Sequence, residues 1–168
     1  MSAIVLVGLM GAGKSTVGRL VAEATGRTLV DVDLAITART GKTVRELWEE
    51  GGEVAYRRLE SDAVHEALAR DDVVLAAPGG VILDPTVRAA LAPAFVVWLR
   101  ADPTALGARV RAGDHRPLLG ADPAADLAAM AADRSDLYAS VADLVVDTDT
   151  HGPDAAAALV LEGLPPTA

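Results

Sequence analysis

The sequence predicts an α/β protein in which a five-stranded parallel sheet lies between two layers of helices. Five short apolar runs rich in β-branched residues are typical of strands that are buried on both faces. Helix-favouring stretches separate these runs, as crossovers between parallel strands require. A glycine-rich segment follows the first run directly, which is typical of a strand-to-helix turn that binds phosphate. The 168 residues suit one domain, with no internal repeat or low-complexity linker.

Each expected element follows from local composition. The strands are expected at residues 3–7, 28–32, 72–77, 94–99 and 143–147. The helices are expected at residues 13–25, 34–69, 85–91, 103–111 and 124–140, and Asp, Thr or Pro stands near several of their starts. The long second helix should be interrupted at 40–43 and again at 50–53. The segment 112–123 is rich in Gly, Pro and charged residues, so we expect a mobile loop there.

Composition and charge exclude several classes of protein. A net charge of −9 argues against a general affinity for nucleic acid. The longest uncharged runs fall short of the ~20 residues of a membrane-spanning helix, and the amino terminus lacks the features of a secretory signal. Cysteine is absent, which fits a reducing compartment. We therefore expect a soluble, cytoplasmic protein without a nucleic-acid or membrane partner.

The segment VGLMGAGKST, residues 7–16, fits the pattern G-x-x-x-x-G-K-[ST] after a strand and before a helix. Glycines allow successive backbone N–H groups to point at phosphate oxygens, and the helix amino terminus adds partial positive charge. Lysine in this pattern contacts the β- and γ-phosphates, and the following hydroxyl contacts Mg²⁺. The predicted nucleotide-binding residues here are Gly11, Ala12, Gly13, Lys14, Ser15 and Thr16, with Ser15 also a predicted metal ligand and Lys14 also catalytic.

A phosphate loop alone suits a GTPase, an ATP-driven motor or a small-molecule kinase. The sequence contains no Asn-Lys-x-Asp guanine signature, and its length leaves no room for the additional modules of a motor. A small-molecule kinase is therefore favoured, and an acceptor site should be recognisable.

Two carboxylates, Asp31 and Asp33, stand at the end of the second expected strand. Residues i and i+2 of a strand share a face, so both side chains can point into the crevice at the carboxyl end of the sheet. One carboxylate can assist Mg²⁺ while the other accepts a proton from the acceptor hydroxyl. Alternatively, Asp33 is the N-cap of a helix that begins near Leu34.

A charged stripe is expected farther along, where Glu53, Arg57 and Glu60 are spaced i, i+4 and i+7. Acids on both sides could orient the Arg57 guanidinium, which would then grip a carboxylate or phosphate with two parallel hydrogen bonds. The alternative is a solvated charged face, which is the favoured interpretation for Arg58.

These motifs together resemble the shikimate kinase family, in the family's order and over nearly the whole chain. The segments that carry the resemblance are GLMGAGKSTVGRLVA, LVDVDLAI, GEVAYRRLE, AAPGGVILDPTVRAAL, HRPLL and RSDLYASVADLVVDT. The resemblance implies a three-layer P-loop kinase fold related to nucleoside monophosphate kinases, with a lid at about 112–123 and an acceptor-binding helical region at about 32–61. It implies Mg²⁺-dependent phosphorylation of the shikimate 3-hydroxyl by ATP, in the route to chorismate and the aromatic amino acids, by a monomer.

For the acceptor, the resemblance implies that Asp33 binds the shikimate hydroxyls and acts as the base. Arg57 would hold the shikimate carboxylate from one side and Arg134 from the other. The backbone N–H groups of Gly79 and Gly80 would face the ring.

For the nucleotide and the metal, the resemblance implies that Asp31 supports Mg²⁺ through water. Arg116, in the lid, would stabilise the transferring phosphoryl group, and Arg109 would lie near adenine. Glu60 would orient Arg57.

Two departures from the family pattern bear on function. Pro78 stands where the family usually has the first of three glycines, so one backbone N–H is lost. His151 lies in the expected adenine loop, where some relatives have arginine, which should weaken stacking on the base. Met10 and Trp48 could line the pocket or belong to the core.

Two other functions compete with this one. A gluconate kinase would show a Gly-Asp and then a His-Pro pattern after the second strand, where this chain has DVDLAI. A nucleotide-sensing module without catalysis would be expected to lack residues such as Asp33, Arg57, Arg116 and Arg134, and all four are present.

Overall fold

The computed structural model describes residues 2–111 and 119–166, and it confirms the predicted fold class. One parallel sheet of five strands has the order β2-β3-β1-β4-β5. The strands are β1 (Ile4–Val7), β2 (Thr28–Asp31), β3 (Val73–Ala76), β4 (Phe95–Arg100) and β5 (Leu144–Asp147).

Helices connect these strands, as the alternating pattern predicts. The helices are α1 (Lys14–Thr25), α2 (Val32–Thr40), α3 (Val44–Leu68), the 3₁₀ helix η1 (Gly79–Leu83), α4 (Pro85–Ala90), α5 (Pro103–Arg111), α6 (Pro123–Val141) and α7 (Pro153–Glu162). None of the helices within the described residues combines the length and the apolar character that crossing a bilayer needs.

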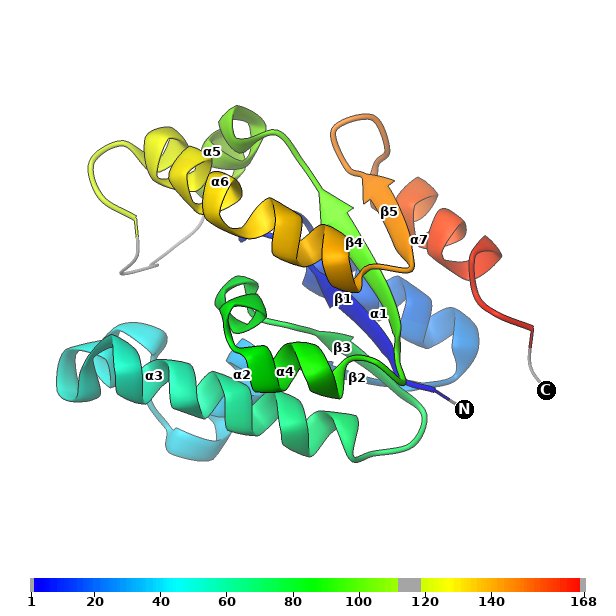
Figure 1. The fold of residues 1–168 in the computed structure, drawn as a ribbon, viewed down its shortest axis with the longest axis horizontal. Helices are drawn as coiled ribbons and strands as arrows, with labels where there is room; N and C mark the ends of the chain where they lie inside the picture. Colours follow the sequence, from blue (N-terminus) through cyan, green and yellow to red (C-terminus); the bar gives the residue numbers. More distant parts are fainter. Residues whose placement is uncertain (1, 112–118, 167–168) are drawn as a thin grey trace.

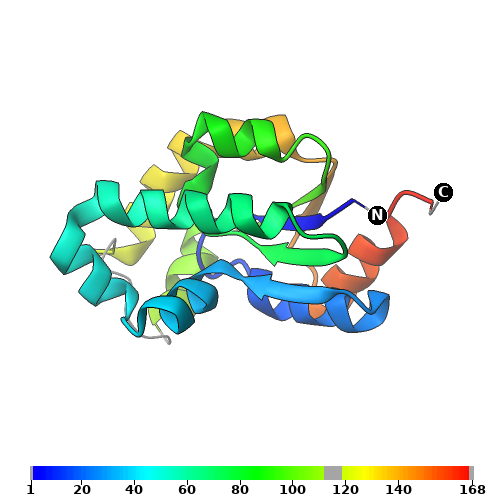
Figure 2. The same cartoon turned by 90° about the horizontal axis from the view of Figure 1, so that it is seen from below.

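The sheet lies between two layers of helices (Figures 1 and 2). Helices α1 and α7 pack against each other on one face, and α3, α4 and α6 lie on the other. The central strands β1 and β3 are buried along their whole length, whereas the edge strand β2 is only partly buried. This difference explains the continuous apolar run of β1, since both of its faces are covered.

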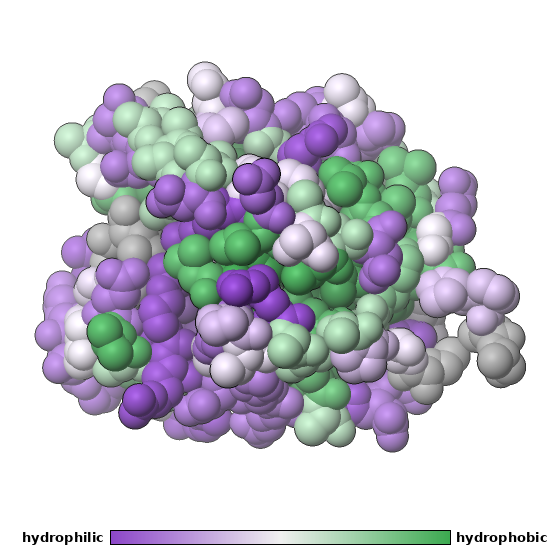
Figure 3. Space-filling model, in the orientation of Figure 1, coloured by the Kyte–Doolittle hydropathy of each residue, from purple (hydrophilic) through white to green (hydrophobic). Residues whose placement is uncertain are grey.

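The outer surface has distinct apolar and hydrophilic regions. In Figure 3, apolar side chains come to the surface mainly in the middle of the view, and the lower left, over α3, is mostly hydrophilic. Arg58 on α3 is exposed, in agreement with its expected place on a solvated face. Met10 is 5% exposed and belongs to the core.

Both predicted interruptions of the long helical region are present. Helix α2 ends at Thr40 and is capped by Gly41 in the left-handed conformation, and α3 begins after Thr43. Thr43 forms a capping box with Glu46, because its hydroxyl accepts from the Glu46 N–H while the glutamate accepts from the Thr43 N–H. Farther along, Gly52 has φ 74° and kinks α3.

Several details differ from the sequence-based expectations, and the 3₁₀ helix η1 is one element that was not expected. Strand β2 ends at Asp31, so Asp33 lies in the first turn of α2 and not at a strand end. The N-cap of α2 is Asp31, whose carboxylate accepts from the Leu34 N–H at 3.3 Å, so the cap role considered for Asp33 is wrong. Helix α7 was not expected, although Pro153 stands at its start. Residues 112–118 of the expected lid lie outside the described residues.

Candidate active site

The glycine-rich loop between β1 and α1 is shaped by backbone constraints. A Cβ at Gly8 would lie 2.4 Å from the Leu99 carbonyl oxygen, so only glycine fits beside β4. Gly13, the N-cap of α1, has φ 92° and no side chain, and no other side chain caps this end of α1 among the described residues. The first N–H groups of α1 are therefore available to an anionic ligand.

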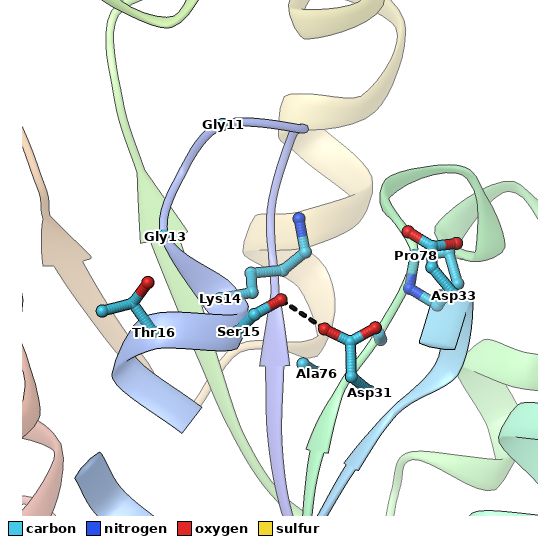
Figure 4. Close-up of a pocket in the computed structure, with 10 residues that line it drawn as sticks. Gly11, Gly13, Lys14, Ser15, Thr16, Asp31, Asp33, Ala76 and Pro78 are labelled. Atoms are coloured by element: carbon cyan, nitrogen blue, oxygen red, sulfur yellow. Dashed lines mark hydrogen bonds between the residues drawn. The ribbon is translucent and has the colours of Figure 1, made fainter. Parts of the chain in front are cut away.

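Lys14 lies beside the same loop. Its ammonium group donates to the carbonyl oxygens of Gly8, at 2.8 Å, and Leu9, at 2.9 Å. Figure 4 shows its side chain extending into the space between the loop and the segment that carries Pro78. A positive charge thus stands at the wall of the cavity, as the phosphate-loop motif predicts.

One cavity, of about 230 Å³, joins the phosphate loop to both carboxylates. Ser15 donates a short hydrogen bond from its hydroxyl to the Asp31 carboxylate, and Asp33 lies across the cavity beside Pro78 (Figure 4). Thr16 points to the other side of α1. The cavity is lined by Gly11, Gly13, Lys14, Ser15, Thr16, Asp31, Asp33, Ala76, Ala77 and Pro78.

The two carboxylates share the cavity for a reason other than the one expected. A strand would place both on one face, whereas here the chain turns directly from β2 into α2. Asp31 ends the strand and Asp33 follows within the first helical turn, where the helix amino terminus favours negative charge. The predicted proximity of Asp31 and Asp33 to the phosphate loop is confirmed, and the strand geometry offered for it is wrong.

A second group of residues surrounds Arg57 on α3. Its guanidinium donates to the buried Glu60 carboxylate at 2.7 Å, and its Nε lies 3.6 Å from Glu53. The guanidinium carbon lies 5.8 Å from the centre of the Trp48 ring. The expected stripe of two acids around Arg57 is thus confirmed, and Trp48 contacts this cation from one side.

Gly80 lies against the same guanidinium. A Cβ at this position would be 1.9 Å from Nη1 of Arg57, a distance that only displacement of the arginine could relieve. Glycine at this position therefore lets the Arg57 guanidinium lie directly against the backbone. Arg57 and Gly80 also line a second cavity, of about 550 Å³, between α3 and the start of α4.

Arg134 and Tyr138 approach the glycine pair from α6. The Tyr138 hydroxyl donates to the Gly79 carbonyl oxygen at 2.6 Å. Burial raises the pKa of Tyr138 to about 12, against the opposing effect of the nearby Arg134 charge. Arg134 is only 6% exposed, yet it forms no ion pair with the acidic residues of the described part of the chain. A buried cation in this state is suited to an anionic ligand.

A third cavity, of about 250 Å³, lies on the far side of the phosphate loop. Arg109 donates to the Thr148 carbonyl oxygen at 3.1 Å, and His151 Nδ1 lies 2.9 Å from the Asp147 carbonyl oxygen. Gly11, Gly13 and Thr16 line this cavity as well as the first one, and Ala12 lines this one alone. The loop thus lies between two cavities and lines both of them.

Arg116 is the one predicted catalytic residue that lies outside the described residues. Sequence patterns gave no functional role to four residues that form hydrogen bonds in or beside the site, namely Tyr56, Tyr138, Ser61 and Asp84. Tyr56 donates to Asp33, Tyr138 to Gly79 and Ser61 to Asp84. The sequence could have pointed to the two tyrosines, because the chain contains only two and each lies close to a predicted shikimate ligand. Tyr56 directly precedes Arg57, and Tyr138 closely follows Arg134.

Comparison with known proteins places this site in a family. The sequence model described as shikimate kinase matches residues 10–165. The chain belongs to the shikimate kinase family. A shikimate kinase from Thermobifida fusca is 45% identical over 161 residues, which cover 96% of this chain and 94% of that protein. One from Mycobacterium tuberculosis is 45% identical over 162 residues, with 95% and 92% covered.

A solved structure agrees with this family in three dimensions. The structure of shikimate kinase from Acinetobacter baumannii in complex with shikimate matches with a TM-score of 0.89 and 35% identity, over 96% of this chain and 90% of that one. Shikimate kinases are ATP-dependent enzymes, so the phosphate loop has the ligand class that its geometry predicts.

The residues at the cavity also fit a magnesium ion. Mg²⁺ prefers oxygen ligands and usually keeps several waters beside one or two protein groups and phosphate oxygens. The Ser15 hydroxyl and the Asp31 carboxylate are such oxygen groups, and they already contact each other. No cluster of three or more His, Cys, Asp or Glu side chains suited to a metal occurs among the described residues.

Proposed function

We propose that this chain transfers the γ-phosphoryl group of ATP to the 3-hydroxyl of shikimate, giving shikimate 3-phosphate and ADP, for the biosynthesis of chorismate and aromatic amino acids. The observation that carries this proposal is the single cavity that holds Lys14, Ser15 and Asp33. A phosphate-binding cation and a candidate base thus face the same space, as in-line transfer requires.

Each side of the transfer has its own set of residues. On the nucleotide side, the loop N–H groups and Lys14 hold the β- and γ-phosphates, and the compartment with Arg109 and His151 holds adenine. Ser15, and Asp31 through water, would hold Mg²⁺, which would neutralise phosphate charge when bound. On the acceptor side, Arg57 and Arg134 hold the shikimate carboxylate from two elements.

The buried charges support the acceptor assignment. Arg134 is buried with no acidic partner among the described residues, and Glu60 fixes Arg57 from behind. Two oriented guanidinium groups near a pair of glycines suit a small carboxylate with neighbouring hydroxyls, because arginine forms paired hydrogen bonds and glycine N–H groups allow close approach. A bound carboxylate would complete the partners of Arg134.

Asp33 accepts or guides the proton of the attacking hydroxyl. The family resemblance further assigns to Arg116 and the lid at 112–123, of which residues 112–118 lie outside the described residues, the stabilisation of the transferring charge and the exclusion of water. We assign this activity to a monomer in the cytoplasm, and the absence of cysteine from the whole sequence is consistent with a reducing compartment.

The test is ADP release by the purified protein with ATP and Mg²⁺, in the presence of shikimate, gluconate or no acceptor. We expect release that depends on shikimate. Asp33→Asn should lower kcat by about 10²–10⁴-fold while nucleotide binding persists, because the phosphate loop makes a separate set of contacts. Asp71→Asn, the same change at an exposed site between α3 and β3, should keep full activity.

The other outcomes separate the competing functions. Release stimulated only by gluconate would assign the acceptor site to a different sugar acid. Nucleotide binding without turnover on either acceptor would favour a sensing module. Normal turnover by Asp33→Asn would leave the activity in place and remove the base role of Asp33.

A further inference from the structure

The two tyrosines of this chain both place their hydroxyl groups on the proposed acceptor site. Tyr138 donates to the Gly79 carbonyl oxygen, and Tyr56 donates to Oδ1 of Asp33 at 3.2 Å. Tyr56 lies on α3 directly before Arg57 and is only 2% exposed. Its hydroxyl therefore reaches from the helix that carries the carboxylate-binding arginine to the helix that carries the candidate base.

The position of the Tyr56 ring is fixed by its surroundings. The ring packs against Trp48, with 5.8 Å between ring centres and an angle of 52° between the planes. Burial on α3 removes most of its rotational freedom, since a buried ring in a close-packed interior keeps one rotamer. The hydroxyl is consequently presented to Asp33 from a rigid support.

A fixed donor changes what the Asp33 carboxylate can do. A carboxylate at the first turn of a helix can rotate, and each orientation aims a different oxygen into the cavity. When Oδ1 accepts from Tyr56, the carboxylate plane is held and Oδ2 can face the acceptor hydroxyl. Proton transfer depends on this aim, because a base must lie within hydrogen-bond reach of the proton that it takes.

A purely structural explanation must be separated from this one. A buried tyrosine hydroxyl usually finds a hydrogen-bond partner, so Asp33 could serve only to satisfy Tyr56. In that case loss of the hydroxyl would affect folding stability and leave the chemical step alone. Rate and stability measurements on one variant can therefore distinguish the two roles.

We propose that Tyr56 is a positioning residue that orients the Asp33 carboxylate for phosphoryl transfer, through a hydrogen bond between α3 and α2. This inference rests on the proposed function, in which Asp33 is the base. It also predicts that the two acceptor elements are coupled, because binding of the shikimate carboxylate at Arg57 would steady the neighbouring Tyr56 and thereby the base.

The test is a double-mutant cycle of Tyr56→Phe and Asp33→Ala, read as the rate of phosphoryl transfer in single turnovers with saturating ATP and shikimate. Tyr56→Phe keeps the ring and removes only the hydroxyl. It should slow transfer by roughly 10-fold, the value of one hydrogen bond to a charged group. In the Asp33→Ala background the same change should have no further effect, because the group through which Tyr56 acts is gone.

Tyr138→Phe is the matched control, since it removes the other buried tyrosine hydroxyl, whose partner is a backbone carbonyl and not Asp33. Its effect should be the same in the wild-type and in the Asp33→Ala background. The unfolding temperature and ATP binding of each variant show whether the fold and the nucleotide side are intact. We expect both to be close to wild type for Tyr56→Phe.

The outcomes are distinct. Wild-type transfer by Tyr56→Phe, or an equal loss in both backgrounds, would overturn the positioning role and leave the proposed function standing. Normal transfer by Asp33→Ala would overturn the base assignment itself. A lower unfolding temperature for Tyr56→Phe with an unchanged transfer rate would reduce Tyr56 to a structural residue.

Discussion

The nucleotide side and the acceptor side of this site are built in different ways. The phosphate loop is local, since Lys14 bonds to carbonyl groups only five and six residues away and the ligand-facing groups are largely backbone N–H. The acceptor side joins distant segments. Tyr56 and Asp33 are 23 residues apart, and Tyr138 and Gly79 are 59 apart. A short motif can therefore specify the first half, whereas the second depends on how helices pack.

The two halves also differ in their electrostatics. The phosphate loop is open to its cavities and presents backbone dipoles together with the Lys14 ammonium group. The acceptor side buries Glu60 and Arg134 and half-buries Arg57. Burying a charge costs free energy that only well-aligned partners offset. Small displacements of the charged side chains should therefore lower ligand affinity more strongly on the acceptor side than on the nucleotide side.

The largest expected effect comes from Gly80→Ala, which tests whether the halves are separable. The new Cβ would overlap the Arg57 guanidinium and displace it from Glu60 and from the acceptor site. Loss of a charge-assisted contact should raise the KM for shikimate by about 10- to 100-fold, with the KM for ATP nearly unchanged. Steady-state kinetics in both substrates measure this.

A matched substitution on the nucleotide side is Gly152→Ala, where a Cβ meets no atom within 4 Å and φ is −65°. It should leave the KM for shikimate at the wild-type value. Equal increases in both KM values for Gly80→Ala would show instead that the two halves are coupled.

The next-largest effect is expected on stability, at a hydrogen bond that joins α3 to α4 on the acceptor side. Ser61 on α3 donates to Asp84, the N-cap of α4, at 2.7 Å. Hydrogen bonds from Ser61 and Thr86 lower the pKa of Asp84 from 3.8 to about 2. Ser61→Ala should therefore lower the free energy of unfolding by about 1 kcal/mol at pH 7, measured by urea denaturation.

The pH dependence of that loss follows from the direction of the shift. A carboxylate whose pKa is lowered by folding stabilises the fold above its unfolded value, and this contribution disappears as the pH falls from about 4 to about 2. The difference between Ser61→Ala and wild type should shrink over this range. Ser140→Ala, at an exposed serine that bonds within its own helix, should show no such change. A constant difference down to pH 2 would contradict the assignment to Asp84.

The smallest effect is expected from His151→Arg on the nucleotide side. Arginine at this edge of the adenine compartment can stack on the base, so the KM for ATP should fall by about 2- to 5-fold while the KM for shikimate stays constant. His65→Arg, at an exposed position on α3, adds the same charge and should leave the KM for ATP unchanged. If both variants lower it, general attraction of the anionic nucleotide explains the effect.

The sequence by itself determined the parts of this protein that depend on local pattern. Apolar runs placed the five strands, glycines and Lys14 marked the phosphate loop, and helical spacing brought Glu60 to Arg57. Each of these features is encoded within a short stretch of chain, where backbone propensity and side-chain period decide the local geometry.

Only the tertiary structure decided the rest of the site. It placed Asp33 on a helix turn and not on a strand, directed the Tyr56 hydroxyl to it, pressed Arg57 against Gly80 and buried Arg134 beside Tyr138. The contacts of Tyr56 with Asp33 and of Arg57 with Gly80 join segments that are distant in sequence, and the burial of Arg134 depends on how α6 packs against η1 and the sheet. Local propensity carries no information on such packing, because it arises from close fit between elements that each form independently.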